Sequence, residues 1–138
     1  MVGILILAHD TLGESLVRCA SHVMGSRPFR LKHLNVGVRD DPQALLQRGI
    51  KLLKQLDDGS GVLILSDMCG GTPCNIASRL LVPGKVEGVA GVSLPMVLRA
   101  LTYRNEPLPM VAAKAMSGGC EGVMRLPVES CGHAAAAG

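Results

Sequence analysis

Two short stretches of the chain contain the residues best suited to chemistry. The first is an uncharged apolar run over residues 2–8 that ends at His9. The second is SDMCGGTPCN, which places Asp67 shortly before two glycines. A neutral histidine can attack with one ring nitrogen when the other carries the proton, and a carboxylate bonded to that N–H fixes this tautomer. His9 and Asp67 are therefore the candidate nucleophile and its orienting carboxylate.

The residues after Asp67 are typical of an anion-binding turn. Gly70 and Gly71 allow a tight turn and a close approach to a ligand. Thr72 is a good N-cap and Pro73 a good first helical residue. A helix that begins here presents free N–H groups and the positive end of its dipole. The GK[ST] pattern of a Walker loop is absent, so the sequence predicts that Thr72 and the turn meet a phosphoryl group held on His9.

Alternating strands and helices must position these residues. Continuous apolar runs predict buried strands, and apolar residues at helical spacing predict helices with one buried face. The predicted strands are 2–8, 31–38, 62–66 and 86–92, and the predicted helices are 12–24, 42–56, 72–81 and 95–103. Residues 110–116 fit a further helix, and residues 122–128 a short strand whose Pro127 suits a sheet edge.

This alternation predicts an α/β fold: a doubly wound, mostly parallel sheet of order 2-1-3-4 with helices on both faces. Residues 1–130 are expected to form a single domain, followed by a tail at 131–138. Ligands of such sheets bind outside the carboxyl ends of the strands, where the strand order reverses. In the assumed order the first and third strands are neighbours, so His9 and Asp67 would face each other across one crevice.

Composition excludes several classes of function. The 138 residues have a net charge of only +3, which argues against a nucleic-acid surface. No apolar run reaches the roughly 20 residues that span a bilayer, so no membrane insertion is expected. Five cysteines without paired spacing suggest reduced thiols in a cytoplasmic protein. Cys69 and Cys74 are interpreted as small apolar fillers, and neither a metal site nor a cofactor is predicted.

Three segments together resemble one protein family. They are AHD with the following LGESLVRCA, then GVLILSDMCGGTPCNIASR, and then VEGVAGVSLPMVLRAL. These segments resemble the mannose-family EIIA proteins of the bacterial phosphoenolpyruvate:sugar phosphotransferase system (PTS), over roughly residues 2–125. The resemblance implies a cytoplasmic phosphotransferase with a transient phosphohistidine at His9. It also implies that Asp67 accepts a hydrogen bond from the other ring nitrogen and that Thr72 lies near the phosphoryl group.

The same resemblance implies partners. HPr would donate the phosphoryl group, and an EIIB protein would accept it on the way to a sugar. A homodimer is implied in which the C-terminal edge strand, here residues 122–128, is exchanged between subunits. The chain ends soon after this segment, so a free-standing EIIA without a fused EIIB domain is expected.

One residue departs from the family pattern, because Asp10 stands where the family usually has glycine. A second carboxylate beside a phosphoryl dianion costs energy unless it points away. Asp10 is itself interpreted as a solvated residue or a cap for the helix at 12–24. Taken singly, His9 could be a satisfied histidine at a strand end, and Asp67 a turn former.

Three other functions remain open at this stage. The phosphotransfer subunit of phosphoenolpyruvate-dependent dihydroxyacetone kinases uses similar chemistry for another acceptor. A regulatory binding protein could be switched by phosphorylation of His9 without passing the group on. A nucleotide-binding domain of flavodoxin-like form fits the fold, but the chain has no recognisable nucleotide fingerprint.

Overall fold

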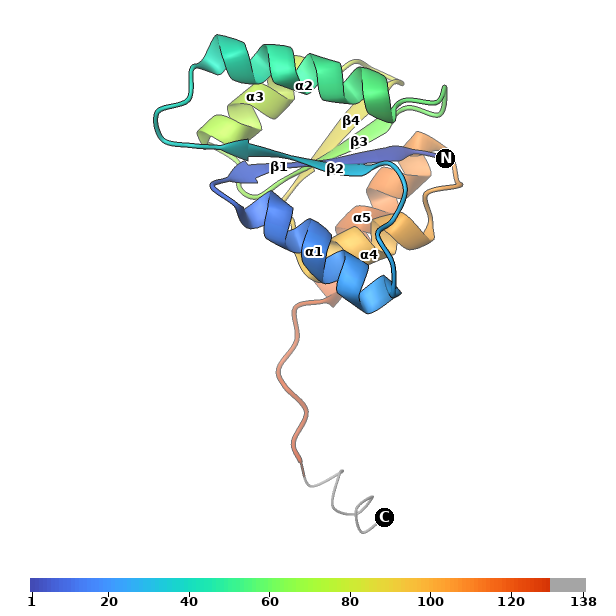
Figure 1. Cartoon of the computed structure of the whole chain (residues 1–138). Helices are drawn as coiled ribbons and strands as arrows, with labels where there is room; N and C mark the ends of the chain where they lie inside the picture. Colours follow the sequence, from blue (N-terminus) through green and yellow to red (C-terminus); the bar gives the residue numbers. More distant parts are fainter. Residues whose placement is uncertain (130–138) are drawn as a thin grey trace.

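Strands and helices alternate from the N-terminus to α4, and a further helix follows (Figure 1). The structure is a computed structural model that describes residues 1–129. Its strands are β1 (Gly3–His9), β2 (Leu31–Val36), β3 (Val62–Ser66) and β4 (Val86–Ala90). Its helices are α1 (Leu12–Met24), α2 (Pro42–Leu56), α3 (Thr72–Leu80), α4 (Leu94–Thr102) and α5 (Leu108–Glu121).

The four strands form one parallel sheet in the order β2-β1-β3-β4. This confirms the predicted order 2-1-3-4, and β1 and β3 are neighbours. In the register of the sheet, Leu7 pairs with Ser66 of β3, and His9 pairs with Val36 of β2. The carboxyl ends of β1, β2 and β3 therefore meet at the same edge.

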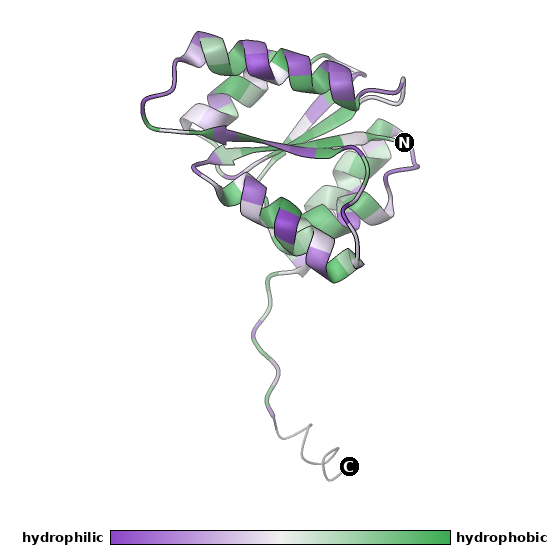
Figure 2. Ribbon diagram, in the orientation of Figure 1, coloured by the Kyte–Doolittle hydropathy of each residue, from purple (hydrophilic) through white to green (hydrophobic). Residues whose placement is uncertain are grey.

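Both faces of the sheet are covered by helices, which explains why the central strands are apolar throughout. Ile4, Ile6 and Ala8 belong to the core formed with α1, α4 and α5. Leu5 and Leu7 belong to the core formed with α2 and α3 on the opposite face (Figure 1). Along α1 and α2, hydrophilic and hydrophobic residues alternate, as expected for helices with one buried face (Figure 2).

A buried arginine closes the edge of the sheet where the strands begin. Arg104 follows α4 and is 7% exposed. Its guanidinium donates to the carbonyls of Val2 (3.0 Å), Phe29 (2.6 Å) and Arg30 (2.8 Å). These carbonyls belong to the entries into β1 and β2, so one side chain joins three distant parts of the chain. Burial is the main cause that lowers the pKa of Arg104.

The last helix is longer than the predicted 110–116. Helix α5 starts at Leu108 and continues through Ser117, Gly118 and Gly119, which resemble stop signals in the sequence. A Cβ on Gly118 would lie 2.5 Å from the Cβ of Arg99 in α4. Glycine is therefore needed at this position because α4 and α5 are closely packed, and the helix does not end there.

The predicted strand at 122–128 forms no ladder with any strand in the described part of the chain. Residues 123–128 run away from the body instead (Figure 1). Two of their side chains, Val123 and Leu126, are 84% and 90% exposed. An exchanged strand would obtain its hydrogen bonds from a second subunit. The predicted tail at 131–138 lies outside the described residues.

Other predicted boundaries were correct or wrong by one or two residues. The strand predicted at 86–92 ends at Ala90, because Gly91 turns the chain with a φ of +87°. The strand predicted at 31–38 ends at Val36.

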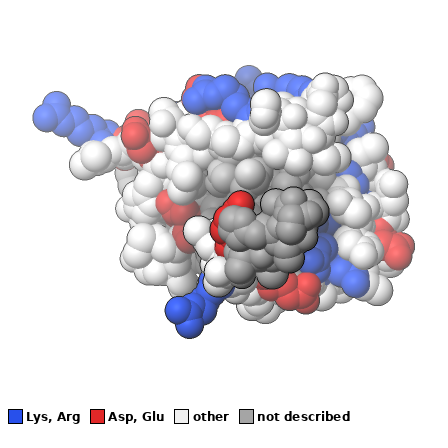
Figure 3. Space-filling view, turned by 90° about the horizontal axis from the view of Figure 1, so that it is seen from below, with Lys and Arg blue, Asp and Glu red and all other residues white. Residues whose placement is uncertain are grey.

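Within residues 1–129, no helix has the length and apolarity needed to cross a membrane. On the face seen in Figure 3, acidic and basic side chains are interspersed among uncharged ones.

Candidate functional site

The candidate site begins where β1 ends. His9 is the last residue of β1, and its side chain is 48% exposed. Asp10 follows in the left-handed region with a φ of +52°, and its N–H donates to the carbonyl of Val36 at 2.8 Å. This turn leads the backbone away from the sheet edge. The imidazole therefore lies at the surface although the rest of the strand is buried.

Asp67 reaches His9 from the end of the neighbouring strand. It directly follows β3, and one of its carboxylate oxygens, Oδ2, lies 2.7 Å from Nδ1 of His9. The same oxygen accepts the backbone N–H of His9 at 2.9 Å. The other oxygen accepts the N–H of Met68, also at 2.9 Å. The carboxylate is thus bound on both sides, and its side chain is only 13% exposed.

These contacts determine the charge of Asp67. Partial burial acts to raise the pKa of the carboxyl group, but the hydrogen bonds from the backbone and ring of His9 and from Met68 outweigh it. The net effect lowers the pKa of Asp67 below its ordinary value, so the group is ionised at neutral pH. An ionised carboxylate can only accept hydrogen bonds. The proton of a neutral His9 ring is therefore assigned to Nδ1, which leaves the lone pair on Nε2.

The glycine turn after Asp67 lies against this free nitrogen. A Cβ built on Gly71 would lie 2.9 Å from Cε1 and 3.3 Å from Nε2 of His9. No side chain fits there without displacing the ring. Gly70 has a φ of +94°, which glycine adopts without strain, and a Cβ there would meet nothing within 4 Å. Gly71 therefore contacts the histidine, whereas Gly70 shapes the turn.

Helix α3 starts at Thr72 as predicted, but the expectation that Thr72 is its N-cap was wrong. Gly71 occupies the cap position, and Thr72 is the first helical residue. The reason is that the Asn75 N–H bonds to the carbonyl of Gly71 at 3.0 Å. The hydroxyl of Thr72 is therefore not engaged as a cap within the described residues. Thr72 and Cys74 have N–H groups in the first turn, where no intrahelical acceptor exists.

A hollow of about 480 Å³ opens beside the histidine. It brings together His9, Asp10 and Thr72 from the predicted site. Its opposite wall comes from the segment between β2 and α2, which the sequence reasoning missed: Val36, Gly37, Val38, Asp40 and Pro42. The strand order contained the signal for this wall, because β2 is the other neighbour of β1.

Asp10 occupies this hollow and does not cap α1. The cap position of α1 belongs to Thr11. Asp10 and Asp40 both line the hollow, so it contains two carboxylates in addition to His9. The side chain of Asp40 accepts a hydrogen bond from the N–H of Gly37 at 2.6 Å, and this bond partly neutralises its negative charge.

In residues 1–129 no cluster of three metal-ligating side chains occurs.

A sequence model of the family described as "PTS system fructose IIA component" (EIIA-man) matches residues 3–116. That match covers most of the chain and includes every residue of the site. The chain belongs to the mannose-family EIIA components of the PTS. This confirms the family that the three segments suggested.

Two relatives found by sequence similarity are longer than this EIIA chain. It is 33% identical over 147 residues to the PTS system mannose-specific EIIAB component of Escherichia coli K12. The match covers 99% of this chain and 44% of the relative, so the chain spans less than half the length of that protein. It is also 32% identical over 107 residues to the transcriptional regulatory protein LevR of Bacillus subtilis, covering 75% of this chain and 11% of LevR.

Solved structures show the same fold. The EIIA component from Streptococcus agalactiae superimposes with a TM-score of 0.81 at 22% identity, covering 91% of this chain and 97% of that one. The mannose/sorbose-specific IIA subunit from Enterococcus faecalis gives 0.82 at 21% identity, covering 92% and 96%. The predicted α/β architecture is therefore shared with known EIIA proteins.

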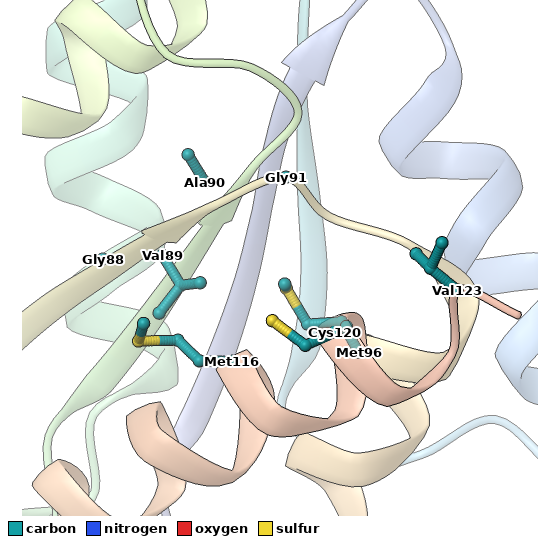
Figure 4. Close-up of a pocket in the computed structure, with 9 residues that line it drawn as sticks. Gly88, Val89, Ala90, Gly91, Met96, Met116, Cys120 and Val123 are labelled. Atoms are coloured by element: carbon teal, nitrogen blue, oxygen red, sulfur yellow. The ribbon is translucent and has the colours of Figure 1, made fainter.

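A second hollow, of about 500 Å³, lies at the free edge of the sheet (Figure 4). One side is the β4 edge from Gly88 to Gly91. The rest consists of apolar and sulfur-containing side chains of α4 and α5 and of Val123: Met96, Met116, Cys120 and Val123. It contains no acid or base, so it is suited to contact and not to catalysis.

Proposed function

We propose that this EIIA chain is a phosphohistidine carrier that accepts a phosphoryl group from phospho-HPr on His9 and passes it to an EIIB partner. The observation that carries the proposal is the 2.7 Å contact between Nδ1 of His9 and Asp67. It leaves Nε2 unprotonated and facing the glycine turn. Membership of the EIIA family supports the same chemistry.

The transfer is an exchange of one bond to phosphorus for another. The lone pair of Nε2 attacks phosphorus while the bond to the donor atom breaks, and that atom leaves with its electron pair. The proton on Nδ1 stays in place, so the phosphorylated ring becomes positively charged. The ionised Asp67 stabilises this charge and holds the ring in position. The reverse sequence delivers the group to the acceptor.

The turn supplies the contacts for the phosphoryl oxygens. The hydroxyl of Thr72 and the N–H groups of Thr72 and Cys74 lie at the positive end of α3. Asp10 and Asp40 oppose this attraction because they are negatively charged. We infer that the phosphoryl group is held less tightly than it would be with glycine at position 10, which favours onward transfer.

Exposed apolar residues around the site fit a protein donor. Val38 is 105% exposed and lines the His9 hollow, and Met68, next to Asp67, is 56% exposed. Leu12, at the start of α1, is 42% exposed. Apolar groups around a reactive residue are typical of the centre of a protein interface. These three residues form the proposed docking rim for HPr and EIIB.

We further propose a homodimer formed by exchange of residues 122–128. In the part of the chain that the structure describes, no further strand pairs with the outer side of β4, apart from an isolated bridge between Val82 and Val86. The apolar hollow beside that edge would be filled by the exposed side chains of a second copy, among them Met124 and Leu126. A chain truncated after Glu121 should then be monomeric by light scattering, whereas the full chain is dimeric. A dimer of the truncated chain would contradict the exchange.

A regulatory role is the second candidate. The similarity to LevR, a transcriptional regulatory protein, covers 75% of this chain. In that role phosphorylation of His9 would change a contact with a partner and no EIIB would be needed. The two candidates share the same phosphorylated residue and differ only in what receives the signal.

The deciding experiment is phosphoryl transfer from labelled phosphoenolpyruvate through enzyme I and HPr. We expect acid-labile label on the wild type and none on His9→Ala, with reduced label on Asp67→Ala. Asp67→Asn should also be slow, because a neutral amide cannot stabilise the positive charge of the phosphorylated ring as the carboxylate does. His22→Ala, an exposed histidine on α1, is the matched control and should be labelled normally.

Two outcomes distinguish the candidates. Release of label from the phosphorylated chain to an added EIIB supports the carrier. Stable label that no EIIB accepts, with a changed affinity for a regulatory partner, supports the second candidate. Absence of label on the wild type, with HPr shown to be phosphorylated, would refute both.

A further inference from the structure

Two cysteines flank the turn that contacts His9. Cys69 is exposed and follows Met68, whereas Cys74 is half-buried in the first turn of α3. Both line a hollow of about 210 Å³ between α3 and β4. The interpretation of Cys69 as an apolar filler was therefore wrong, because exposure leaves its thiol accessible to reagents.

The two thiols interact with each other. The hydrogen bond between the side chains of Cys69 and Cys74 is the main cause that raises the pKa of Cys69. Flexible backbone separates them, since Gly70 and Gly71 lie in between. Because both thiols line the same hollow of about 210 Å³, movement of the glycine turn can bring their sulfur atoms to the roughly 2.05 Å of a disulfide bond.

The hollow that the thiols share contains an unpaired polar group. Ser66 is 3% exposed, and its hydroxyl has no hydrogen-bond partner in the described part of the chain. A buried hydroxyl without a partner, such as that of Ser66, can form a hydrogen bond with a small polar molecule. Hydrogen peroxide is of suitable size and hydrogen-bonding capacity, and it would then lie beside both sulfur atoms.

We propose that Cys69 and Cys74 form a reversible disulfide that slows phosphoryl transfer at His9. The loop that this bond closes contains Gly70, Gly71 and Thr72, which are the residues of the phosphate turn. Because Gly71 lies against Cε1 and Nε2 of His9, movement of the turn changes the space at the reactive nitrogen. The regulatory effect rests on the proposed carrier function, whereas formation of the bond does not.

Hydrogen peroxide supplies the oxidation. The thiolate of Cys74 attacks a peroxide oxygen, because the raised pKa of Cys69 keeps that thiol protonated, and the attack gives a sulfenic acid and, with one proton, water. The second thiol then attacks the sulfenic sulfur, forming the S–S bond and releasing a second water. Two electrons pass from the two sulfurs to the peroxide. A dithiol such as dithiothreitol returns both electrons by thiol–disulfide exchange.

The first test measures the bond itself. Cys19, Cys120 and Cys131 are replaced by serine, so that Cys69 and Cys74 are the only thiols. After stoichiometric peroxide, we expect the intact mass to fall by two hydrogen atoms and both sites to resist alkylation until dithiothreitol is added. Adding Cys69→Ser or Cys74→Ser should leave a single thiol and no such loss. Continued alkylation of both thiols after peroxide would overturn the proposal.

The second test measures transfer from phospho-HPr to the reduced and oxidised forms of the same protein. The oxidised form should be phosphorylated at least about tenfold more slowly, since displacement of a reacting group by about 1 Å can cost a hundredfold. Dithiothreitol should restore the rate, and the Cys74→Ser variant should be insensitive to peroxide. Equal rates for both forms would overturn the regulatory effect. Absence of transfer to the reduced form would instead refute the carrier function.

Discussion

Polar groups have different roles at the two ends of the parallel strands, which are called here the edge where the strands begin and the edge where they end. At the edge where the strands begin, Arg104 binds three carbonyls, and the terminal ammonium of Met1 pairs with Asp58 at 3.0 Å. At the edge where the strands end, His9 is half exposed and one of its nitrogens is free. Charged groups at the first edge hold separate parts of the chain together, whereas those at the second are exposed and available for the proposed phosphoryl transfer.

The difference shows where this fold can change without losing stability. Removal of a buried guanidinium that donates to three carbonyls should lower the stability, because each acceptor loses a donor, although the carbonyl of Arg30 keeps the N–H of Ile4 at 3.0 Å. The opposite edge contains exposed side chains, such as those of His9 and Asp10, whose replacement leaves no buried carbonyl without a donor. Mutations at the two edges should therefore affect different measurements.

The largest effect is expected at the closed edge. Arg104→Met should lower the free energy of unfolding by about 3 kcal/mol, because three buried or partly buried carbonyls lose their donor. Urea denaturation measures this loss. Arg18→Met is the control, since Arg18 is 66% exposed and its pair with Glu14 contributes about 0.5 kcal/mol or less. Equal losses in both variants would contradict the comparison.

Gly71→Ala should separate transfer from stability at the open edge. The φ of Gly71 is −100°, which alanine adopts without strain, but its Cβ would displace the His9 ring. We expect phosphoryl transfer to fall about a hundredfold, with little change in stability. Gly70→Ala should behave in the opposite way, because its φ of +94° is strained for alanine although the space is empty. Wild-type transfer rates in Gly71→Ala would show that the contact has no functional role.

Removal of the carboxylate at position 10 should have a moderate effect. Asp10→Asn keeps a residue that tolerates the left-handed region but removes a negative charge from the His9 hollow. Phosphorylation by HPr should become roughly threefold to tenfold faster at low ionic strength, and the gain should shrink in salt. Asp10→Gly tests the backbone as well. Acceleration in the glycine variant alone would indicate strain and not charge.

The smallest effect concerns stability in acid. The pKa of Asp67 is lower in the folded chain than its usual 3.8, so its ionised form stabilises the fold above pH about 4. That contribution is lost as the pH falls through the folded pKa. The difference in unfolding free energy between the wild type and Asp67→Asn should therefore shrink below pH about 4. A difference that grows in acid would mean that the pKa of Asp67 is raised.

Much of the fold was predictable because the central strands are continuous apolar segments of the sequence. Residues 62–65 and most of β1 are apolar without interruption, as is typical of strands covered on both faces. The start of α2 was equally clear, because Asp41 and Pro42 form a cap whose side chain accepts the N–H of Gln43. The end of α5 was not predictable, since Gly118 is explained by the distant Arg99.

The site was predictable in part. His9 and Asp67 could be paired once a strand order was assumed, because parallel strands bring their carboxyl ends to one edge. The β2–α2 wall, the cap at Gly71 and the contact of Gly71 with the ring depend on where loops pack. Local residue preferences carry no information on such packing.

The sequence by itself determined the alternation of elements, the apolar centre of the sheet and the identity of the candidate reactive groups. These follow from periodicity and residue type, which are local properties. Only the tertiary structure decided that one oxygen of Asp67 binds both the backbone and the ring of His9, and that Asp10 lines the same hollow. The reason is that such contacts join residues far apart in the chain, or depend on how loops settle at the sheet edge.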